Sequence, residues 1–387
     1  MSDIQKLKAV LIGCGGMGGN QARILAKSEY YDLLAVADLD QARAEKLAAE
    51  LNCRAYGDAK EMLETEKPEV VSVPASNVAH APMTILAARM PGVLGVYCEK
   101  PMAMNMKEAR EMVEACKKNK VALVINHQRR IGHDLMTARK LIEDGAIGEV
   151  RLLRGQCAGD ILSDGTHLID SCMYLLGDPK AEWVLGQLHR EIDDAMLERA
   201  AKQREKGQPG EAGFRFGHPV ENGGMAEIGL GGNLRFEILC GDMREENRIY
   251  QDYEIFGTEG RIWRTGDGAK PNLYIQDAQG GDWSVGVDDK WLLRPLSPEE
   301  SGGKGKGGWR PVDIIEGLPK PHIDGAYERF YRMIRDGEDH PMNGDIALQH
   351  FEMLMAIYES ARLSKKITLP LEQDRFPLEV MIEDGRA

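Results

Sequence analysis

A glycine-rich run and a later aspartate are the first residues whose types and spacing could do chemistry. The run Gly13-Cys14-Gly15-Gly16-Met17-Gly18 joins an apolar segment to a segment with helical spacing. In that context a G-x-G-x-x-G pattern lets the backbone approach a pyrophosphate, and the helix N-terminus supplies N–H donors and a partial positive charge. Asp38 ends the next apolar segment, twenty residues after Gly18, where a carboxylate accepts hydrogen bonds from an adenosine ribose and repels a 2′-phosphate. We therefore expect a dinucleotide site that prefers NAD to NADP.

Asp38 also has a purely structural explanation, because a carboxylate just before a helix caps its N-terminus. The helix is expected to begin near Gln41, and Asp40 is better placed than Asp38 to cap it. NADP is the less favoured cofactor, and it stays an alternative because the Arg43 side chain could bind a 2′-phosphate.

A lysine follows another apolar run, in Tyr97-Cys98-Glu99-Lys100-Pro101. Pro101 disfavours helical geometry at Lys100 and fixes the turn. Beyond the end of a strand, the ammonium would lie partly desolvated near the nicotinamide half of the cofactor, where its pKa should fall. Such a lysine positions a substrate hydroxyl or shares in its deprotonation. A surface lysine paired with Glu99 explains the same residues equally well.

The third candidate is the sequence Asp164-Gly165-Thr166-His167. A histidine at the start of a helix, three residues after an aspartate, can be oriented by that carboxylate and take a proton near neutral pH. An N-cap at Asp164 with His167 in the first turn fits the same spacing, and local physics alone favours it.

The elements that position these residues follow a simple order in the first third of the chain. Strand-like apolar runs at 7–13, 32–38, 68–74, 92–100 and 121–126 alternate with helix-like runs. This order predicts a doubly wound α/β (Rossmann) fold, with a parallel sheet covered by helices on both faces. Ligands of such sheets bind beyond the carboxyl ends of the strands, so the glycine run, Pro74 to Asn77 and Glu99 to Pro101 should border one crevice.

The strict alternation stops after Asn126, which divides the chain into domains at 1–126 and 127–387. A helix is expected over 133–145, and runs at 183–190, 225–230, 234–241, 253–263 and 291–296 favour an α+β domain with a large, open, mostly antiparallel sheet. Residues 198–213 and 301–309 have the composition of insertions or mobile loops. Trp309 either closes over a sugar ring or anchors its loop to its own domain, and we favour the anchoring role.

The composition excludes some classes of partner. The formal charge of −13 over 387 residues argues against nucleic acid, which needs a basic surface. No signal-peptide pattern and no apolar run of about 18 residues is present, so we expect a cytoplasmic protein without a membrane partner. The seven cysteines are scattered without a C-x-x-C pair, which favours reduced thiols and no metal site.

Taken together, GCGGMG, ADLD, EKP, NHQRRIGHDLMTARKLIEDGAIGEV and DGTHLID resemble the glucose–fructose oxidoreductase/inositol dehydrogenase (Gfo/Idh/MocA) family, and the resemblance continues to the C-terminal HPMNGDIALQHFEMLMAIYESARLSKKITLPL. It implies a catalytic Lys100, whose peptide bond to proline is often cis in relatives, and a His167 acid/base. It also implies homodimers or homotetramers that form through the exposed face of the second sheet.

The resemblance also supplies roles for other residues. Beyond the glycine run and Asp38, the expected cofactor contacts are Pro74, Ser76, Asn77, His80, Glu99, Lys100 and Gln128. The expected substrate contacts are Lys100, Arg129, Asp160, Asp164 and His167. Relatives usually place an aspartate four residues before the histidine, where this chain has Ser163. Either Asp160 or Asp164 could therefore take the role of that aspartate beside His167, and we take Asp164 as the catalytic carboxylate.

These features predict an NAD-dependent dehydrogenase that oxidises a secondary hydroxyl of a sugar, glycoside or cyclitol, with a 3-keto sugar as one reasonable product. One alternative is a hydrolase or lyase that retains NAD and acts through transient oxidation. A second alternative is a non-catalytic regulator that senses NAD or a sugar, although such a protein need not keep both Lys100 and His167.

Overall fold

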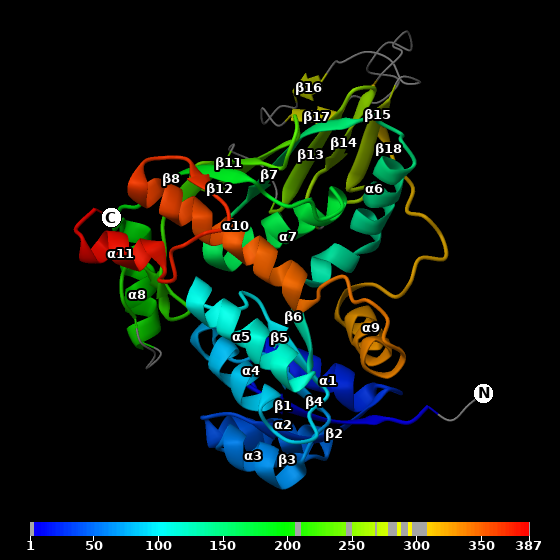
Figure 1. Cartoon of the computed structure of the whole chain (residues 1–387), viewed down its shortest axis with the longest axis vertical. Coiled ribbons are helices and arrows are strands. Elements are labelled where there is room, and N and C mark those ends of the chain that lie inside the picture. The colour runs from blue at the N-terminus through cyan, green and yellow to red at the C-terminus, as the bar shows by residue number, and fades with distance from the viewer. Residues whose placement is uncertain are drawn as a thin grey trace.

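The computed structural model describes residues 4–205, 210–244, 250–267, 269–277, 285–287, 293–295 and 308–386. Its first part is a six-stranded, wholly parallel sheet with the strand order β3-β2-β1-β4-β5-β6 (Figure 1). The elements are β1 (Leu7–Ile12), α1 (Gly16–Lys27), β2 (Tyr31–Ala37), α2 (Gln41–Leu51), β3 (Arg54–Tyr56), α3 (Ala59–Glu66), β4 (Val70–Val73), α4 (His80–Ala88), β5 (Gly95–Glu99), α5 (Met106–Asn119) and β6 (Ala122–Asn126). The predicted doubly wound fold is confirmed, with β3 as an additional strand that the apolar pattern did not reveal.

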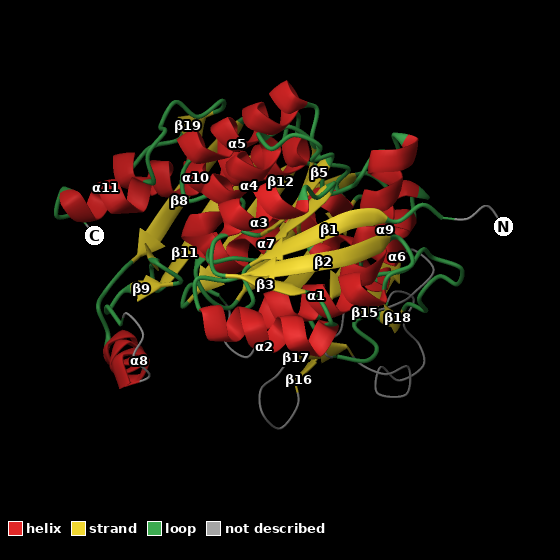
Figure 2. Cartoon of the chain, turned by 90° about the horizontal axis from the view of Figure 1, so that it is seen from below, coloured by secondary structure: helices red, strands yellow, loops and turns green. Residues whose placement is uncertain are grey.

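Side chains of successive strand residues point to opposite faces of this sheet, and each face has its own core. On one face Leu11 and Val36 pack with side chains of α1, α2 and α9 (His322–Asp336). On the other face Val10 and Val71 pack with α3, α4 and α5. Figure 2 shows α1 and α2 on the opposite side of the sheet from α4 and α5. Burial on both faces explains why the strands are almost wholly apolar.

The second part is a nine-stranded sheet with the order β18-β15-β14-β13-β7-β12-β11-β8-β19. Only β7 and β12 pair in parallel among these strands, so the prediction of a mostly antiparallel sheet is confirmed. Its strands are β7 (Val150–Cys157), β8 (Trp183–His189), β11 (Gly223–Gly229), β12 (Arg235–Gly241), β13 (Asp252–Gly257), β14 (Gly260–Arg264), β15 (Leu273–Asp277), β18 (Arg310–Pro311) and β19 (Ile367–Thr368).

Helices and two short hairpins complete this part of the chain. The helices are α6 (His133–Glu143), α7 (Thr166–Leu175), α8 (Asp194–Glu205), α10 (Gly344–Leu363) and α11 (Pro377–Glu383), with α9 beside the first sheet. The hairpins are formed by β9 (Phe214–Arg215) with β10 (His218–Pro219), and by β16 (Val285–Val287) with β17 (Leu293–Pro295). A helical turn, Ile161–Gly165, leads directly into α7.

The chain returns to the first sheet long after residue 126, where β6 ends. In α9 the ring of Tyr327 stacks on Tyr97 of β5 with 4.3 Å between the centroids, and its carbonyl accepts a hydrogen bond of 2.8 Å from the Tyr31 hydroxyl. A helix from the C-terminal third of the chain therefore completes the core on one face of the first sheet.

The predicted insertions are only partly described. Helix α8 covers 194–205, whereas residues 206–209 and 301–307 lie outside the described residues. The Trp309 ring lies 5.9 Å from that of Trp263 in β14, which agrees with anchoring to its own sheet.

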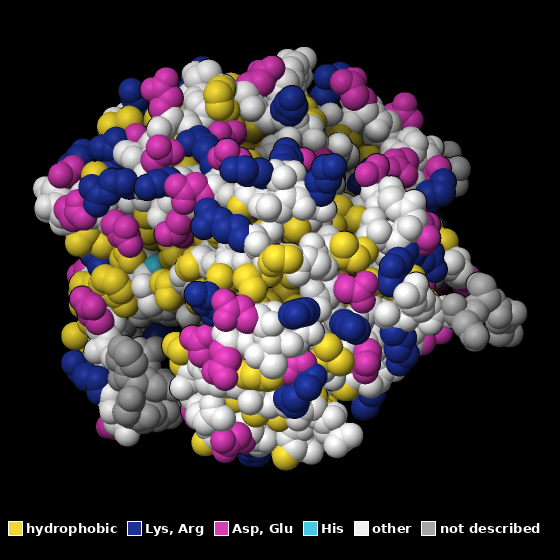
Figure 3. Space-filling model, turned by 60° about the horizontal axis from the view of Figure 1, so that its bottom comes forward, with side chains coloured by type: hydrophobic (Ala, Val, Ile, Leu, Met, Phe, Trp, Pro, Cys, Tyr) yellow, Lys and Arg dark blue, Asp and Glu magenta, His cyan; other side chains and the backbone are white. Residues whose placement is uncertain are grey.

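The surface carries charges of both signs. On the described part of the face in Figure 3, Lys and Arg side chains are interspersed with Asp and Glu, without a continuous basic surface. Among the described helices, none is both long and apolar enough to cross a membrane.

Candidate active site

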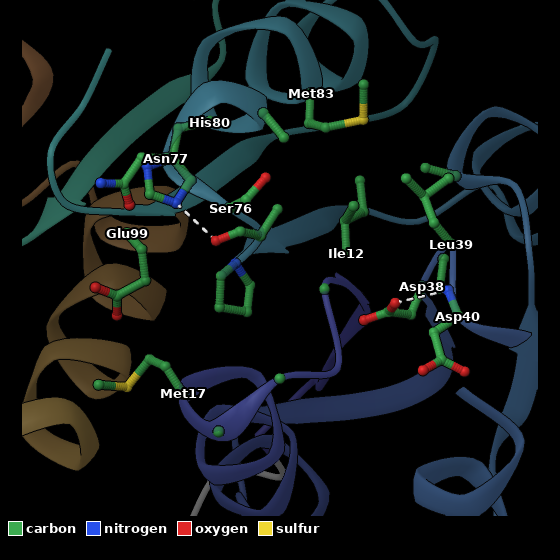
Figure 4. Close-up of a pocket in the computed structure, with 18 of the residues that line it drawn as sticks. Ile12, Met17, Asp38, Leu39, Asp40, Ser76, Asn77, His80, Met83 and Glu99 are labelled. Carbon is green, nitrogen blue, oxygen red and sulfur yellow. Dashed lines mark hydrogen bonds between the residues drawn. The ribbon is translucent and has the colours of Figure 1, made fainter. Parts of the chain in front are cut away.

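The three loops predicted to meet at the carboxyl end of the first sheet do border one cavity, of about 770 Å³. Figure 4 shows side chains from these loops around it, with Asp38 on one side and Glu99 and His80 on the other. The predicted cofactor residues in its lining are Gly13, Gly15, Gly16, Met17, Asp38, Pro74, Ser76, Asn77, His80, Glu99 and Lys100. Cys14, Gly18 and Gln128 are not part of the lining.

The glycine turn has two kinds of position. Gly13 has φ +105°, and a Cβ there would lie 2.6 Å from the Cα of Ala75, while a Cβ at Gly18 would collide with the Gly13 carbonyl. These two glycines are needed to pack the turn and α1 against the sheet. At Gly15 and Gly16 an added Cβ would meet nothing within 4 Å. The cavity therefore leaves room beside the backbone of Gly15 and Gly16, which fits a dinucleotide pyrophosphate at the start of α1.

Asp38 lies at the rim of the cavity opposite Glu99 and His80 (Figure 4), and backbone N–H groups hold its carboxylate. Its Oδ2 accepts a 2.7 Å hydrogen bond from the Cys14 N–H and its Oδ1 one of 2.9 Å from the Asp40 N–H. The Arg43 guanidinium lies 3.3 Å from Asp38 and 3.0 Å from Asp40, so its charge is already matched by two carboxylates. Asp40 caps α2, as predicted, by accepting from the Arg43 N–H. This rim suits a ribose hydroxyl better than a 2′-phosphate.

Cys14 contributes to this rim through its backbone alone. Its side chain is buried, with Sγ 3.6 Å from the Ala37 carbonyl. Burial raises the pKa of the thiol to about 12, so the sulfur stays protonated and inert.

At the other end of the cavity, the Lys100 Nζ donates a 2.9 Å hydrogen bond to the Ser163 carbonyl of the second domain. The peptide bond between Lys100 and Pro101 is cis. Burial lowers the pKa of the Lys100 amine, while the negative charges of Glu99, Asp164 and Asp160 oppose that shift. The predicted direction of the Lys100 pKa shift is confirmed. The hydrogen-bond partner of the Lys100 ammonium is the Ser163 carbonyl and not the Glu99 carboxylate of the alternative surface pair.

Glu99 belongs to a buried hydrogen-bond network. Its Oε1 accepts from Gln21 Nε2 at 2.5 Å and from Asn126 Nδ2 at 2.6 Å. Burial raises the pKa of this carboxyl. Glu99 is thus fixed between α1 and β6. Gln21 was missed from the sequence, where its only signal is an amide on the buried face of a helix.

His80 connects two of the converging loops. Its Nδ1 lies 2.7 Å from the Pro101 carbonyl and its Nε2 lies 3.1 Å from that of Ala75. Burial lowers its pKa to about 4, so the ring is neutral at pH 7, and we place its proton on Nδ1, the nitrogen with the shorter contact. His80 holds the loops after β4 and β5 together while also lining the cavity.

His167 lies in the first turn of α7, buried beside His127. The two rings meet edge to face with 5.6 Å between centroids, and His127 Nε2 lies 2.9 Å from Thr166 Oγ1. Burial, followed by the charge of Lys100, keeps the pKa of His167 well below its ordinary value. Its Nδ1 is buried and has no hydrogen-bond partner within the described part of the chain.

The two candidate carboxylates are held by an arginine that the sequence did not single out. Arg215 Nη1 lies 2.6 Å from Asp164 and 3.0 Å from Asp160, and the Tyr250 hydroxyl donates to Asp164 at 2.9 Å. Asp160 also caps the turn before α7, accepting from the Ser163 N–H at 2.7 Å. Neither carboxylate has a hydrogen bond to His167 among the described contacts, so its orientation by Asp164 stays a prediction.

Two further cavities flank this region. One, of about 860 Å³, is lined by Asp160, Asp164, Arg215, Glu221 and Tyr250, among others. The other, of about 480 Å³, contains Gln128 and Arg129. Arg129 pairs with Asp267, and its guanidinium lies 4.9 Å from the centre of the Tyr250 ring. Of the expected substrate residues, Lys100 lines the main cavity, Asp160 and Asp164 line the second and Arg129 lines the third, whereas His167 lines none of the three.

Part of the chain is similar in sequence to known proteins. Residues 7–127 match the Gfo/Idh/MocA oxidoreductase family, NAD-binding Rossmann fold. A 2,7-anhydro-N-acetylneuraminate hydratase from Mediterraneibacter gnavus is 34% identical over 36% of this chain and 36% of its own length. A D-glucoside 3-dehydrogenase from Escherichia coli is 30% identical over 46% of this chain and 56% of its own length. The matches thus span about a third to about a half of these curated relatives.

The fold similarity extends further than the sequence similarity. The structure of the WlbA dehydrogenase from Chromobacterium violaceum, in complex with NADH and UDP-GlcNAcA, has a TM-score of 0.70 at 18% identity, over 96% of this chain and 98% of that one. Both domains therefore share the fold of that protein. At the level of sequence, the glycine turn and Asp38 lie within residues 7–127, the part of this chain that is similar to the Gfo/Idh/MocA oxidoreductase family with its NAD-binding Rossmann fold.

Proposed function

We propose that this protein is an NAD-dependent dehydrogenase that oxidises a secondary hydroxyl group of a sugar, glycoside or cyclitol. One observation carries the proposal: a single cavity extends from the Asp38 rim past the glycine turn to Lys100, whose amine has a lowered pKa. The name of the D-glucoside 3-dehydrogenase relative supports a sugar substrate and makes a 3-keto product the first candidate.

The residues of the main cavity fit the cofactor in separate parts. Asp38 would accept hydrogen bonds from the adenosine ribose, and the open backbone at Gly15 and Gly16 would receive the pyrophosphate at the N-terminus of α1. Glu99 and Lys100 would border the nicotinamide half. When bound there, NAD supplies the acceptor for the hydride that leaves the alcohol carbon.

The protein's own side chains handle the proton. Oxidation of a CH–OH group releases one hydride and one proton, and the proton needs an acceptor near the hydroxyl oxygen. Lys100 and His167 are the two candidates, because burial disfavours the charged form of both groups. The Ser163 carbonyl orients Lys100 Nζ, which holds the amine where a substrate hydroxyl can reach it.

A second function is favoured by one observation, the similarity to a hydratase. In that case the same residues would oxidise a carbon transiently, allow loss or addition of water at its neighbour, and restore the alcohol. The cofactor would end each turnover in its starting state.

Absorbance at 340 nm distinguishes these functions. Purified protein is mixed with NAD and a panel of sugars, glycosides and cyclitols, and the products are analysed by mass spectrometry. We expect net NADH formation with one substrate class. A change of substrate without NADH would support the hydratase or another NAD-retaining reaction. Bound NAD with no change in any substrate of a broad panel would favour a sensor.

A further inference from the structure

The backbone N–H, the carbonyl and the hydroxyl of Ser163 each have a hydrogen-bond partner. Its N–H donates to Asp160 at 2.7 Å, its carbonyl accepts from Lys100 Nζ at 2.9 Å, and its hydroxyl lies 3.1 Å from Nε2 of His218. Ser163 is 1% exposed and lines the main cavity. It therefore links the lysine at the cavity to a buried histidine behind it.

The contacts of His218 fix which nitrogen carries its proton. Nδ1 lies 2.9 Å from the Pro219 carbonyl, which can only accept, so Nδ1 is the donor. Nε2 is then the acceptor for the Ser163 hydroxyl. Burial lowers the pKa of His218, opposed by Asp160 and aided by Arg215 and Lys100, the charged groups that face it. The ring is therefore neutral at pH 7 and keeps its lone pair on Nε2.

The hairpin that carries His218 contacts the same loop at several points. Arg215 of β9 holds both Asp160 and Asp164, and Phe216, 55% exposed, lines the main cavity. Side chains of the β9–β10 hairpin thus contact residues 160–164. Phe216, in the turn of the hairpin, borders the cofactor cavity.

We propose that His218 is a positioning residue for Lys100: it accepts a hydrogen bond from the Ser163 hydroxyl and so fixes the carbonyl to which Lys100 Nζ donates. This role rests on the proposed function, in which Lys100 handles the substrate proton.

The test uses the full-length protein and five variants: His218→Ala, Ser163→Ala, the double variant, His218→Gln and His340→Ala. Glutamine keeps an acceptor that can reach the serine hydroxyl. His340 is the matched control, because it is also 1% exposed and hydrogen-bonded to a backbone carbonyl, but that carbonyl belongs to Ala326 in α9 and not to the segment around Ser163.

Two readouts are measured, of which one needs no turnover. The first is kcat and KM with NAD and the substrate found at 340 nm. The second is the rate at which acetic anhydride acylates Lys100 at pH 10.5, followed by peptide mass spectrometry.

We expect His218→Ala and Ser163→Ala each to lower kcat by about tenfold, the loss of one well-placed hydrogen bond, with little change in KM. The double variant should fall no further than either single one, because both changes break the same link. His218→Gln should recover most of the rate. Acylation of Lys100 should be about threefold faster in His218→Ala, since its anchor is loosened, and unchanged in His340→Ala.

Losses that multiply in the double variant, or an unchanged acylation rate in His218→Ala, would overturn the role of His218. The acylation result also separates this inference from the proposed function. Faster acylation in His218→Ala, in a protein that turns over no substrate, would uphold the positioning and reject the dehydrogenase.

Discussion

The two ends of the main cavity differ in the chemical groups that line them. At the Asp38 end, the wall is mainly backbone, with open space beside Gly15 and Gly16 and a carboxylate held by N–H groups. At the Lys100 end, side chains and a carbonyl from separate segments meet, and burial shifts the pKa values of Lys100 and His167. The first end is suited to binding a ligand by shape and hydrogen bonding, and the second to moving a proton.

The largest effect should come from Lys100→Met, which keeps the length of the side chain and removes its amine. We expect kcat to fall by a factor of about 100 or more, while the Kd for NAD, measured by titration calorimetry, changes little. Lys107→Met is the control, since Lys107 is exposed and its ion-pair partner among the described residues is Glu111. A variant with full turnover would place the proton transfer elsewhere.

His167→Ala should have the next largest effect on the rate. We expect about a thirtyfold loss in kcat, because one of two proton acceptors is removed. Added imidazole should restore part of the rate by filling the space beside His127. Absence of rescue, with intact folding by circular dichroism, would count against a direct role in proton transfer.

At the binding end, two glycine substitutions should act differently. Gly15→Ala adds a methyl group where the structure has room but the pyrophosphate is expected, so the Kd for NAD should rise by about tenfold with an unchanged melting temperature. Gly18→Ala drives a methyl group into the Gly13 carbonyl and should lower the melting temperature of the protein without ligand. Equal effects of both variants on stability would contradict this division of roles.

The smallest effect concerns stability alone. Burial lowers the pKa of His340 to about 4, below its value of about 6.5 in the unfolded chain. The unfolded state therefore gains the proton first, and stability that is intact above pH 6.5 is lost as the pH falls toward 4. One such group accounts for about 3 kcal/mol over that range. His340→Asn should flatten the pH dependence of urea unfolding, and an unchanged slope would contradict the assignment.

The same comparison explains how much could be predicted from the sequence. The glycine turn, Asp38 and Lys100 each follow an apolar strand, and strand ends of a parallel sheet converge, so one crevice follows from spacing alone. Arg215 and His218 lie on two-residue strands without periodicity, and nothing local indicates that they reach Asp160 and Ser163. Strand β3 escaped notice because it has three residues and none of them is fully buried.

Contacts between segments that lie far apart in the chain also could not be predicted from the sequence. Helix α9 has a clear apolar face, but nothing in its own sequence says that it packs on a sheet formed some 200 residues earlier, where Tyr327 meets Tyr31 across 296 positions of the chain. Gln21 of α1 likewise donates to Glu99 of β5, 78 positions along the chain, and nothing local in the sequence indicates that contact.

Deuterium transfer to the cofactor tests the central claim most directly. A substrate that carries deuterium on its ring carbons is incubated with the protein and NAD, and the nicotinamide is examined by mass spectrometry. The proposed function predicts that one deuterium appears in the reduced cofactor for each molecule oxidised, and that the Lys100→Met variant transfers it at least about 100 times more slowly. Consumption of the substrate with no deuterium in the nicotinamide at any time would contradict hydride transfer in this cavity.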